Sequence, residues 1–502
     1  MSEQPHAQLL NRELCSNLEE NLSDIQTILN VPINEDVVLR RYRCGGFAAC
    51  AIYIEGMADD RKISEFILHA CKDEPPETPV PAQARAQKLM DDYIEVAQCR
   101  LESQIRKLIE GILGGMTAVL ADGATDALLM ETRGFAHRQV DKPSNEAVVI
   151  GAQEGFVENI RANITLVRRY VQSAQLITER LTVGTGVPTG VALMYLKGVA
   201  KDKVIDEARR RLKSIQSASV QGIGCIQQLI EDQPRSIFPQ MLQTERPDRA
   251  ASCLLEGQFV ILAENSPYAL TAPVTLFHLI HASDDTFMRW QYASFLRVIR
   301  ILGLVLSLLL PGFYVALMLH HTHLVPLTLL LSIAETRANV PFTILFEVLL
   351  MEFSFYLINE AGTRIPSQIG STVSIVGALI LGQAAVSASI ISPILIILVA
   401  LTGLGSYAVP NYSFGLSIVL YRLMIVFTGA LLGLYGILAA AVGILIHLCS
   451  IHSFGVPYLA PIAPHRPHNP DILLRLSVRR QTKLMFFARR DSWLRKEEAP
   501  EK

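Results

Sequence analysis

The stretch SFGLSIVLYRLMIVFTGALLGLYGILAAAVGILIHLCS, residues 413–450, contains one charged residue, Arg422. A helix needs roughly 20 apolar residues to cross a bilayer. The stretch is therefore long and apolar enough to predict membrane helices. Lys, Arg, Asp and Glu are also absent from residues 301–334, 365–421 and 423–465.

The rest of the chain has a different composition. Of the 502 residues 18% are charged, against about 25% in an ordinary soluble domain, but the first 290 residues carry charges throughout. The net charge of −2 gives no general attraction to nucleic acid. No apolar leader precedes this charged part, so we expect it to stay in the cytoplasm. From Arg466 onward ten Lys or Arg face five Asp or Glu, which predicts a cytoplasmic tail as well.

The charged part reads as a soluble two-lobed α/β domain ahead of an α-helical transmembrane domain. The apolar runs 37–39 and 49–54, which flank Gly45-Gly46, predict a hairpin, and the spacing over 82–113 predicts one long helix. The strand–turn–strand pattern of 116–131 returns at 259–273. The expected divisions are a polar N-terminal segment (1–35), two α/β subdomains (36–150 and 151–290), a membrane domain of about four to five segments (291–455) and a basic tail (456–502).

The membrane domain leaves its number of crossings open. Five crossings would place the basic tail outside, so an even number, with one segment re-entrant, fits the charge rule better. Gly429 and Gly433 are spaced for close helix packing. The expected segments are 298–320, 340–358, 371–389 and 392–409, followed by an interfacial helix 413–422 and a span 424–449.

Two carboxylates interrupt the second apolar segment. Glu347 and Glu352 would each cost roughly 2.5–3.5 kcal/mol in mid-membrane, so they must face protein, a partner or water unless this helix is interfacial. For Glu352 we expect either pairing with an arginine near a segment end or exposure to permeating cations. The available arginines are Arg337, Arg364 and Arg422.

The third segment has two opposite faces at the helical period. One face of small residues suits helix packing, and the other suits a pore lining, with ordinary interhelical hydrogen bonding as the alternative. The packing face holds Ser374, Gly377, Ala384 and Ala388, and the polar face holds Thr372, Gln383 and Ser387.

Catalytic and metal-binding motifs are not recognisable. His320, His321 and His323 lie together where an apolar run ends, which favours a polar helix end over a metal site. No set of nucleophile and base has motif support. The sequence therefore predicts no enzyme, no metal and no cofactor.

Several stretches resemble the A-subunit family of spore germination proteins, the GerA family. The resemblance runs from about residue 36 to 480. The stretches that carry it are EGFVENIRANITLVRR (154–169), YLKGVA (195–200), FPQMLQTERPD (238–248), LLEG (254–257), LLMEFSFYLINEAGTRIP (349–366), SIVGALILGQAAV (374–386) and SFGVPYLAPIAP (453–464).

This resemblance implies a multi-pass protein of the spore inner membrane. Such subunits are expected to form homo-oligomeric, pentameric ion channels in the lipid bilayer that work with B-type and C-type subunits and release monovalent cations. Two alternatives stay open: a proton- or cation-coupled transporter that uses Glu347 or Glu352, and an auxiliary member of the SpoVAF type that senses no nutrient itself.

Overall fold

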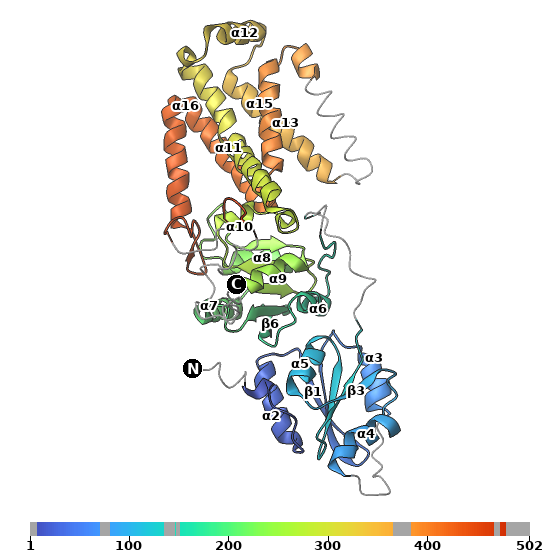
Figure 1. Ribbon diagram of the computed structural model, residues 1–502. Helices are drawn as coiled ribbons and strands as arrows, with labels where there is room; N and C mark the ends of the chain where they lie inside the picture. The colour runs from blue at the N-terminus through green and yellow to red at the C-terminus, as the bar shows by residue number, and fades with distance from the viewer. Residues whose placement is uncertain are drawn as a thin grey trace, which may run out of the picture.

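The protein is long, and its parts follow one another in chain order (Figure 1). The structure, a computed structural model, describes residues 8–70, 81–134, 146, 151–364, 383–465 and 472–477. Two α/β lobes lie at one end and a bundle of apolar helices lies at the other.

The first lobe is a three-layer sandwich around the sheet β1-β2-β4-β5-β3. Strand residues alternate between its faces: Ala118 and Leu120 contact the core under α2 and α5, whereas Val119 and Ala121 contact the core under α3, η1 and α4. The elements are α2 (Leu18–Leu29), β1 (Val37–Cys44), β2 (Phe47–Ile54), α3 (Asp60–Ile63), η1 (Ser64–Leu68), α4 (Ala82–Asp92), β3 (Cys99–Glu102), α5 (Ile105–Leu113), β4 (Thr117–Ala121) and β5 (Ala127–Met130).

The sequence predicted the β1–β2 hairpin correctly but not the ends of this lobe. The segment 1–35 is not a separate polar segment, because α2 buries Leu22 and Ile25 in the core of the lobe. The single helix over 82–113 was also wrong. Pairing with β5 makes Cys99–Glu102 a strand between α4 and α5, and helical spacing alone did not reveal that pairing.

The second lobe repeats this arrangement in the sheet β6-β7-β9-β10-β8. Helices α6 and α9 cover one face, and α7 and α8 cover the other. The elements are α6 (Ile160–Tyr170), β6 (Leu176–Val183), β7 (Thr189–Leu196), α7 (Asp202–Lys213), α8 (Gly222–Ile230), β8 (Leu242–Thr244), α9 (Pro247–Leu255), β9 (Phe259–Ala263), β10 (Ala269–Ala272), α10 (Leu276–Ile280) and η2 (Ser283–Thr286).

Much of the two lobes is also equivalent residue by residue. Most elements of the second lobe begin 142 residues after their counterparts, as subtraction of the first residue numbers shows for β2 and β7 (Phe47, Thr189), α5 and α9 (Ile105, Pro247), β4 and β9 (Thr117, Phe259) and β5 and β10 (Ala127, Ala269). Gly56 and Gly198 follow this spacing and have φ of 83° and 85°. The echo noticed between 116–131 and 259–273 therefore belongs to a duplication of the whole lobe.

A buried ion pair joins the lobes. Arg168 of α6 donates from Nη2 to Asp36 Oδ1 at 2.7 Å and pairs with the other carboxylate oxygen through Nε. Both residues are at most 2% exposed. Thr178 Oγ1 donates to Asp36 at 3.1 Å, and Lys197 donates to Asn30 at 2.5 Å. These bonds hold the lobes as one unit.

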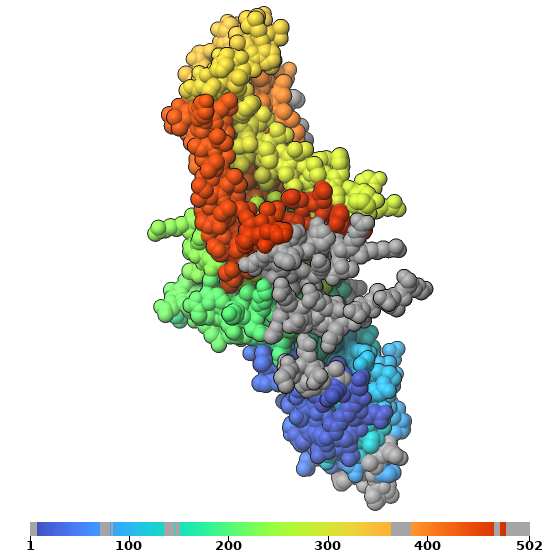
Figure 2. Space-filling view, turned by 60° about the vertical axis from the view of Figure 1, so that its left-hand side comes forward, coloured from blue at the N-terminus to red at the C-terminus, as the bar shows by residue number. Residues whose placement is uncertain are grey.

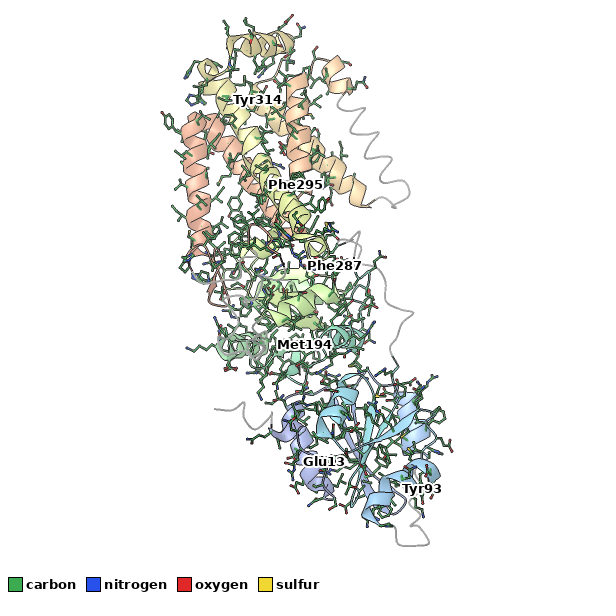
Figure 3. All side chains as sticks on the ribbon, in the orientation of Figure 1. Glu13, Tyr93, Met194, Phe287, Phe295 and Tyr314 are labelled. Atoms are coloured by element: carbon green, nitrogen blue, oxygen red, sulfur yellow. The ribbon has the colours of Figure 1, made fainter. Side chains whose placement is uncertain are left out.

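The bundle consists of α11 (Trp290–His320), α12 (Leu327–Arg337), α13 (Ile344–Arg364), α15 (Pro393–Tyr407) and α16 (Tyr412–Ser450). Within the described residues, α11 and α16 are long and apolar enough to cross a membrane, judged by length and composition. In Figure 3, Phe295 lies toward the lobe end of α11 and Tyr314 toward its far end. Asp285, which accepts hydrogen bonds from Arg297 and Arg300, fixes the start of α11 to the second lobe.

Helix α16 is a hairpin of two helical arms. At Gly433 φ is 62° and ψ is −144°, a conformation open only to glycine, which divides α16 into a first arm (412–432) and a second arm (434–450). The ring of Phe238 contacts Tyr421 of the first arm and His447 of the second, so both arms reach the second lobe. The break expected after Arg422 is therefore wrong, and glycine geometry puts it at Gly433.

The chain returns from α16 to the second lobe. We call residues 451–458 the C-terminal strap. Ser453 Oγ donates to the Gln240 carbonyl at 2.7 Å, and the Tyr458 hydroxyl donates to the Pro239 carbonyl at 2.8 Å. Phe454 joins the core of the lobe. Figure 2 shows the second arm as a column that runs along the bundle down to this contact.

Candidate functional site

Four helices of the bundle meet around one arginine. Arg422, in the first arm of α16, is fully buried. Its Nη2 lies 3.1 Å from Glu352 Oε2 of α13, and its Nη1 donates to Ser307 Oγ of α11 at 3.0 Å and to Ser406 Oγ of α15 at 3.2 Å. The guanidinium carbon lies 5.4 Å from the ring centre of Tyr356. One cation thus connects all four helices.

A proline prepares the acceptor for this arginine. Pro311 lies inside α11 and has no N–H, so the carbonyl of Ser307 four residues earlier loses its helical partner. Arg422 Nη1 donates to that carbonyl at 3.3 Å. The Ser307 and Ser406 hydroxyls also lie 2.7 Å apart. The sequence pattern of Pro and Ser in α11 therefore creates a polar point inside an apolar helix.

The ion pair of Arg422 and Glu352 does not satisfy every polar atom around it. Among the described residues, Glu352 Oε1, Arg422 Nε and the Tyr356 hydroxyl are buried without a hydrogen-bond partner. An unpaired polar group costs about 1–3 kcal/mol when it is buried, and more when it is charged. The site therefore has unused hydrogen-bonding capacity within the bundle.

A second carboxylate lies closer to the far end of the bundle. Glu347, 1% exposed, accepts from Arg337 Nη2 at 2.7 Å. Its other oxygen accepts from the backbone N–H of Ser392 at 3.3 Å, at the start of α15. Arg337 and the N-terminal end of α15 thus bind the two oxygens of this carboxylate.

Glycines bring the helices close around these charges. A Cβ atom at Gly405 would lie 2.4 Å from the carbonyl oxygen of Gly303, and one at Gly429 would lie 2.9 Å from that of Gly312. Backbones that approach this closely allow the short side chains of Ser307 and Ser406 to reach Arg422.

The structure brings together some of the residues that the sequence singled out. Glu347 and Glu352 lie between helices in ion pairs. Gln383 and Ser387 are exposed, as are Ala384 and Ala388, while the neighbouring Ala385 packs against the bundle. Ala384 and Ala388 of the expected packing face are thus exposed within one chain, and the packing role of the face stays a prediction. Thr372, Ser374 and Gly377 lie outside the described residues.

The sequence named Arg422 as one of three possible partners of Glu352, and the structure shows this pair, but the sequence did not predict that Arg422 lies at the centre of the site. It treated Arg422 as the end of an interfacial helix, whereas Arg422 lies in the middle of the first arm. A signal was present: Ser307 precedes Pro311 by one helical turn, and Ser406 lies on another apolar helix. Among the described residues no group of three or more His, Cys, Asp and Glu could hold a metal ion. His320 instead contacts the Ala430 carbonyl oxygen at 2.7 Å.

A duplicated α/β domain joined to an apolar helical bundle with buried ion pairs defines the class: membrane-associated proteins that carry a two-lobed α/β domain. The profile of the Bacillus/Clostridium GerA spore germination protein family matches residues 23–485. The chain belongs to this family.

Individual relatives agree over nearly the full length. Spore germination protein A1 of Bacillus subtilis is 37% identical over 90% of this chain and 92% of its own length. Spore germination protein KA of the same organism is 35% identical over 91% and 83%. The uncharacterized membrane protein YfkQ of Bacillus subtilis is 36% identical over 93% and 90%.

One solved structure is also similar. The crystal structure of the N-terminal domain of the A subunit of the Bacillus megaterium spore germinant receptor GerK3 covers 52% of this chain and 97% of its own, at 29% identity and a TM-score of 0.41.

Proposed function

We propose that this protein is a multi-pass subunit of a spore germination complex. The chain assembles as a homo-oligomer, a pentamer, in the lipid of the spore inner membrane. The helical bundles of this oligomer form a gated path that releases monovalent cations. The two lobes lie in the cytoplasm, and B-type and C-type subunits are the partners. Membership of the GerA family and the names of the relatives support the role in germination.

An even number of crossings supports this topology. Asn359 near the end of α13 contacts Tyr407 at the end of α15, and Glu347 near the start of α13 contacts Ser392 at the start of α15, so these two helices are parallel. The C-terminal strap reaches the same lobe from which α11 starts, which supports an even number of passes for the bundle.

The observation that carries the gating proposal is the buried pair of Arg422 and Glu352. In a bundle of apolar helices, one charge without the other is expensive, so each charge stabilises the arrangement of helices that holds the pair. A trigger that separates α13 from the first arm of α16 would break the pair and expose both charges to water and cations. The pair then acts as the lock of the closed state.

The test is the removal of one charge. In spores or liposomes that carry Glu352→Gln, Arg422 loses its counter-charge, and we expect cation release without a trigger together with loss of thermal stability in detergent. The charge swap Glu352→Arg with Arg422→Glu should restore part of the thermal stability and reduce the release that occurs without a trigger. Glu335→Gln, an exposed carboxylate on α12, is the matched control. Unchanged flux and unchanged stability in Glu352→Gln would reject the lock.

The predicted pore lining is a separate proposal. Thr372, Gln383 and Ser387 line the path where chains of the oligomer meet, and Ser374, Gly377, Ala384 and Ala388 pack between helices. The exposure of Gln383 and Ser387 in a single chain supports this placement. Gln383→Leu should lower cation release and leave oligomer size unchanged, and wild-type flux would remove Gln383 from the path.

A coupled transporter is the second candidate, and the unpaired Glu352 Oε1 favours it, because a buried carboxylate can bind a proton. A transporter would move cations against their own gradient, at a fixed ratio to the protons that drive the transport. A channel would pass them only down their own gradient. The auxiliary, SpoVAF-type role differs in another way: deletion would slow germination by every nutrient equally, whereas loss of a receptor would abolish the response to particular nutrients.

A further inference from the structure

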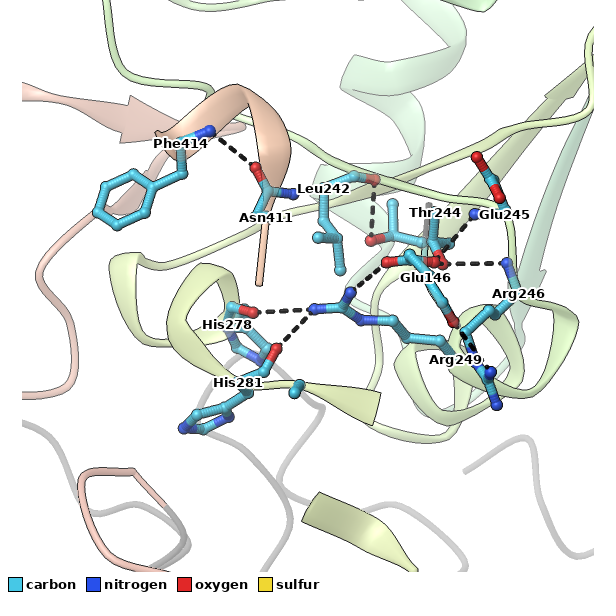
Figure 4. A network of polar contacts seen from close by, with 12 residues as sticks. Glu146, Leu242, Thr244, Glu245, Arg246, Arg249, His278, His281, Asn411 and Phe414 are labelled. Carbon is cyan, nitrogen blue, oxygen red and sulfur yellow. Dashed lines mark hydrogen bonds and ion pairs between the residues drawn. The ribbon is translucent and has the colours of Figure 1, made fainter. Parts of the chain in front are cut away.

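A carboxylate from the linker between the lobes is bound on the second lobe (Figure 4). Glu146 Oε2 accepts from Thr244 Oγ1 at 2.5 Å and from the backbone N–H of Glu245 at 3.1 Å. Its Oε1 accepts from Arg249 Nη1 at 2.5 Å, and its backbone carbonyl accepts from Arg246 Nη1 at 3.3 Å. Both carboxylate oxygens are thus bound, by residues about one hundred positions away.

The two arginines have different tasks. Arg246, whose side chain is fully buried, forms an ion pair with Asp248 at 2.7 Å and donates to the Ala152 carbonyl. Its charge is therefore already compensated. Arg249, 11% exposed in its side chain, has Glu146 as its ion-pair partner. Arg249 supplies the positive charge of the site.

The duplicated lobe shows what this position requires. At the spacing of 142 residues, Glu102 corresponds to Thr244 and Lys107 to Arg249. In the first lobe Glu102 Oε1 accepts from the backbone N–H of Gln104 at 3.2 Å and lies 3.9 Å from Lys107 Nζ. A carboxylate thus lies at the start of the helix in both lobes, where the helix dipole favours an anion. The first lobe supplies it from its own strand, whereas the second lobe has a hydroxyl and obtains it from elsewhere.

We propose that Thr244, Glu245 and Arg249 form a carboxylate-binding site on the second lobe, which Glu146 occupies in cis and which a free small carboxylate occupies when Glu146 is removed. The hydroxyl, the backbone N–H and one guanidinium nitrogen match the two oxygens of a carboxylate. The site is independent of the proposed cation path.

A carboxylate bound at this site affects the position of residues at the base of the bundle. Arg249 Nη2 donates to the carbonyls of His278 and His281 at 3.2 and 3.0 Å, at the end of α10. Helix α11 begins at Trp290, soon after this point. A guanidinium held by a carboxylate on one side and by these carbonyls on the other fixes α10 relative to α9. Loss of the carboxylate frees the guanidinium to move, and the start of α11 with it.

The experiment uses the full chain in detergent with acetate as the probe. Trp493→Phe leaves Trp290 as the single tryptophan, so its fluorescence reports on the start of α11. We expect Glu146→Ala to lower the melting temperature and shift this fluorescence. Acetate, but not chloride at equal ionic strength, should reverse both changes, and the effect should grow with the logarithm of acetate concentration.

Two comparisons separate the sources of the carboxylate. The protein with Glu146 intact should not respond to the acetate concentration that rescues Glu146→Ala, because the Glu146 carboxylate already occupies the site. Glu146→Ala combined with Thr244→Val and Arg249→Ala should not respond at any concentration. If Glu146→Ala does not fold, Glu146→Gln keeps the shape of the side chain, and acetate should stabilise it more than chloride does. Equal effects of acetate and chloride, or equal rescue of the triple variant, would overturn the proposal.

Discussion

The two lobes have the same fold but different surroundings. Both use an asparagine in the same way: Asn21 accepts from the Cys15 N–H and donates to the Cys15 carbonyl, and Asn163 does the same with Val157, 142 residues later. These bonds close the start of α2 and of α6. The two lobes therefore share this side-chain contact as well as their fold.

The lobes differ where the second one meets the bundle. In the first lobe the Glu131 N–H donates to the Gln98 carbonyl at 3.0 Å and extends the pairing of β5 with β3. At the same spacing the second lobe has Pro273 and Gln240. Proline has no N–H, so the Gln240 carbonyl is left for Ser453, whose oxygen also accepts from the Val274 N–H at 3.0 Å. The edge of the second lobe at Gln240 is thus bound by the C-terminal strap where the first lobe uses its own backbone.

The largest effect is expected where the lobes join. Asp36→Ala leaves Arg168 buried without its counter-charge and should lower the free energy of unfolding by about 3–5 kcal/mol. Urea unfolding followed by circular dichroism measures this, with the exposed Glu65→Ala as control. If the lobes were independent units, Asp36→Ala would cost no more than Glu65→Ala.

The asparagine pair tests whether the lobes are equivalent in energy. Asn21→Ala and Asn163→Ala each remove this pair of bonds to the backbone, and Asn163→Ala also removes a bond to the Ser266 carbonyl at 3.5 Å. Each should cost about 1–3 kcal/mol. Because the sites are far apart, the double variant should equal the sum to within about 0.5 kcal/mol. A large cost in one lobe and none in the other, measured by the same urea unfolding, would contradict the equivalence.

The strap contact should have a smaller cost. Ser453→Ala leaves the Gln240 carbonyl and the Val274 N–H without this partner, and we expect a loss of about 1–2 kcal/mol because water can replace part of the contact. Limited proteolysis should then cut near the strap faster than in the exposed-site control Ser252→Ala. Equal cleavage rates would show that Phe454 and Tyr458 hold the strap alone.

The smallest effect concerns pH. Burial, together with nearby Arg297, lowers the pKa of His281 well below its usual range, and its Nε2 donates to the Ile472 carbonyl at 2.6 Å. A group whose pKa is lowered on folding stabilises the protein above its unfolded pKa. Stability should therefore fall as the pH drops below about 6.5, by at most about 1.4 kcal/mol per pH unit. Melting temperatures of His281→Gln should lose this part of the slope, whereas His69→Gln, at an exposed site of the first lobe, should keep it.

Local pattern accounts for much that the sequence predicted. The charge-free runs, the β1–β2 hairpin around Gly45-Gly46 and the strand–turn–strand segments follow from composition and period, which adjacent residues set. Helical spacing failed over 82–113 because β3 becomes a strand only by pairing with β5. The buried carboxylates Glu347 and Glu352 could be selected because a charge in an apolar run demands a partner. Their partners could not be chosen, because three arginines were available.

The sequence by itself determined that this protein has a charged α/β part followed by apolar helices, and that it belongs to the GerA family. Hydropathy, strand alternation and family motifs all depend on the order of residues along the chain. The tertiary structure decided that Arg422 pairs with Glu352, that α16 turns back at Gly433 and that Glu146 binds on the second lobe. Each of these contacts depends on backbones brought together in space, and several alternatives satisfy the same local pattern until the helices pack.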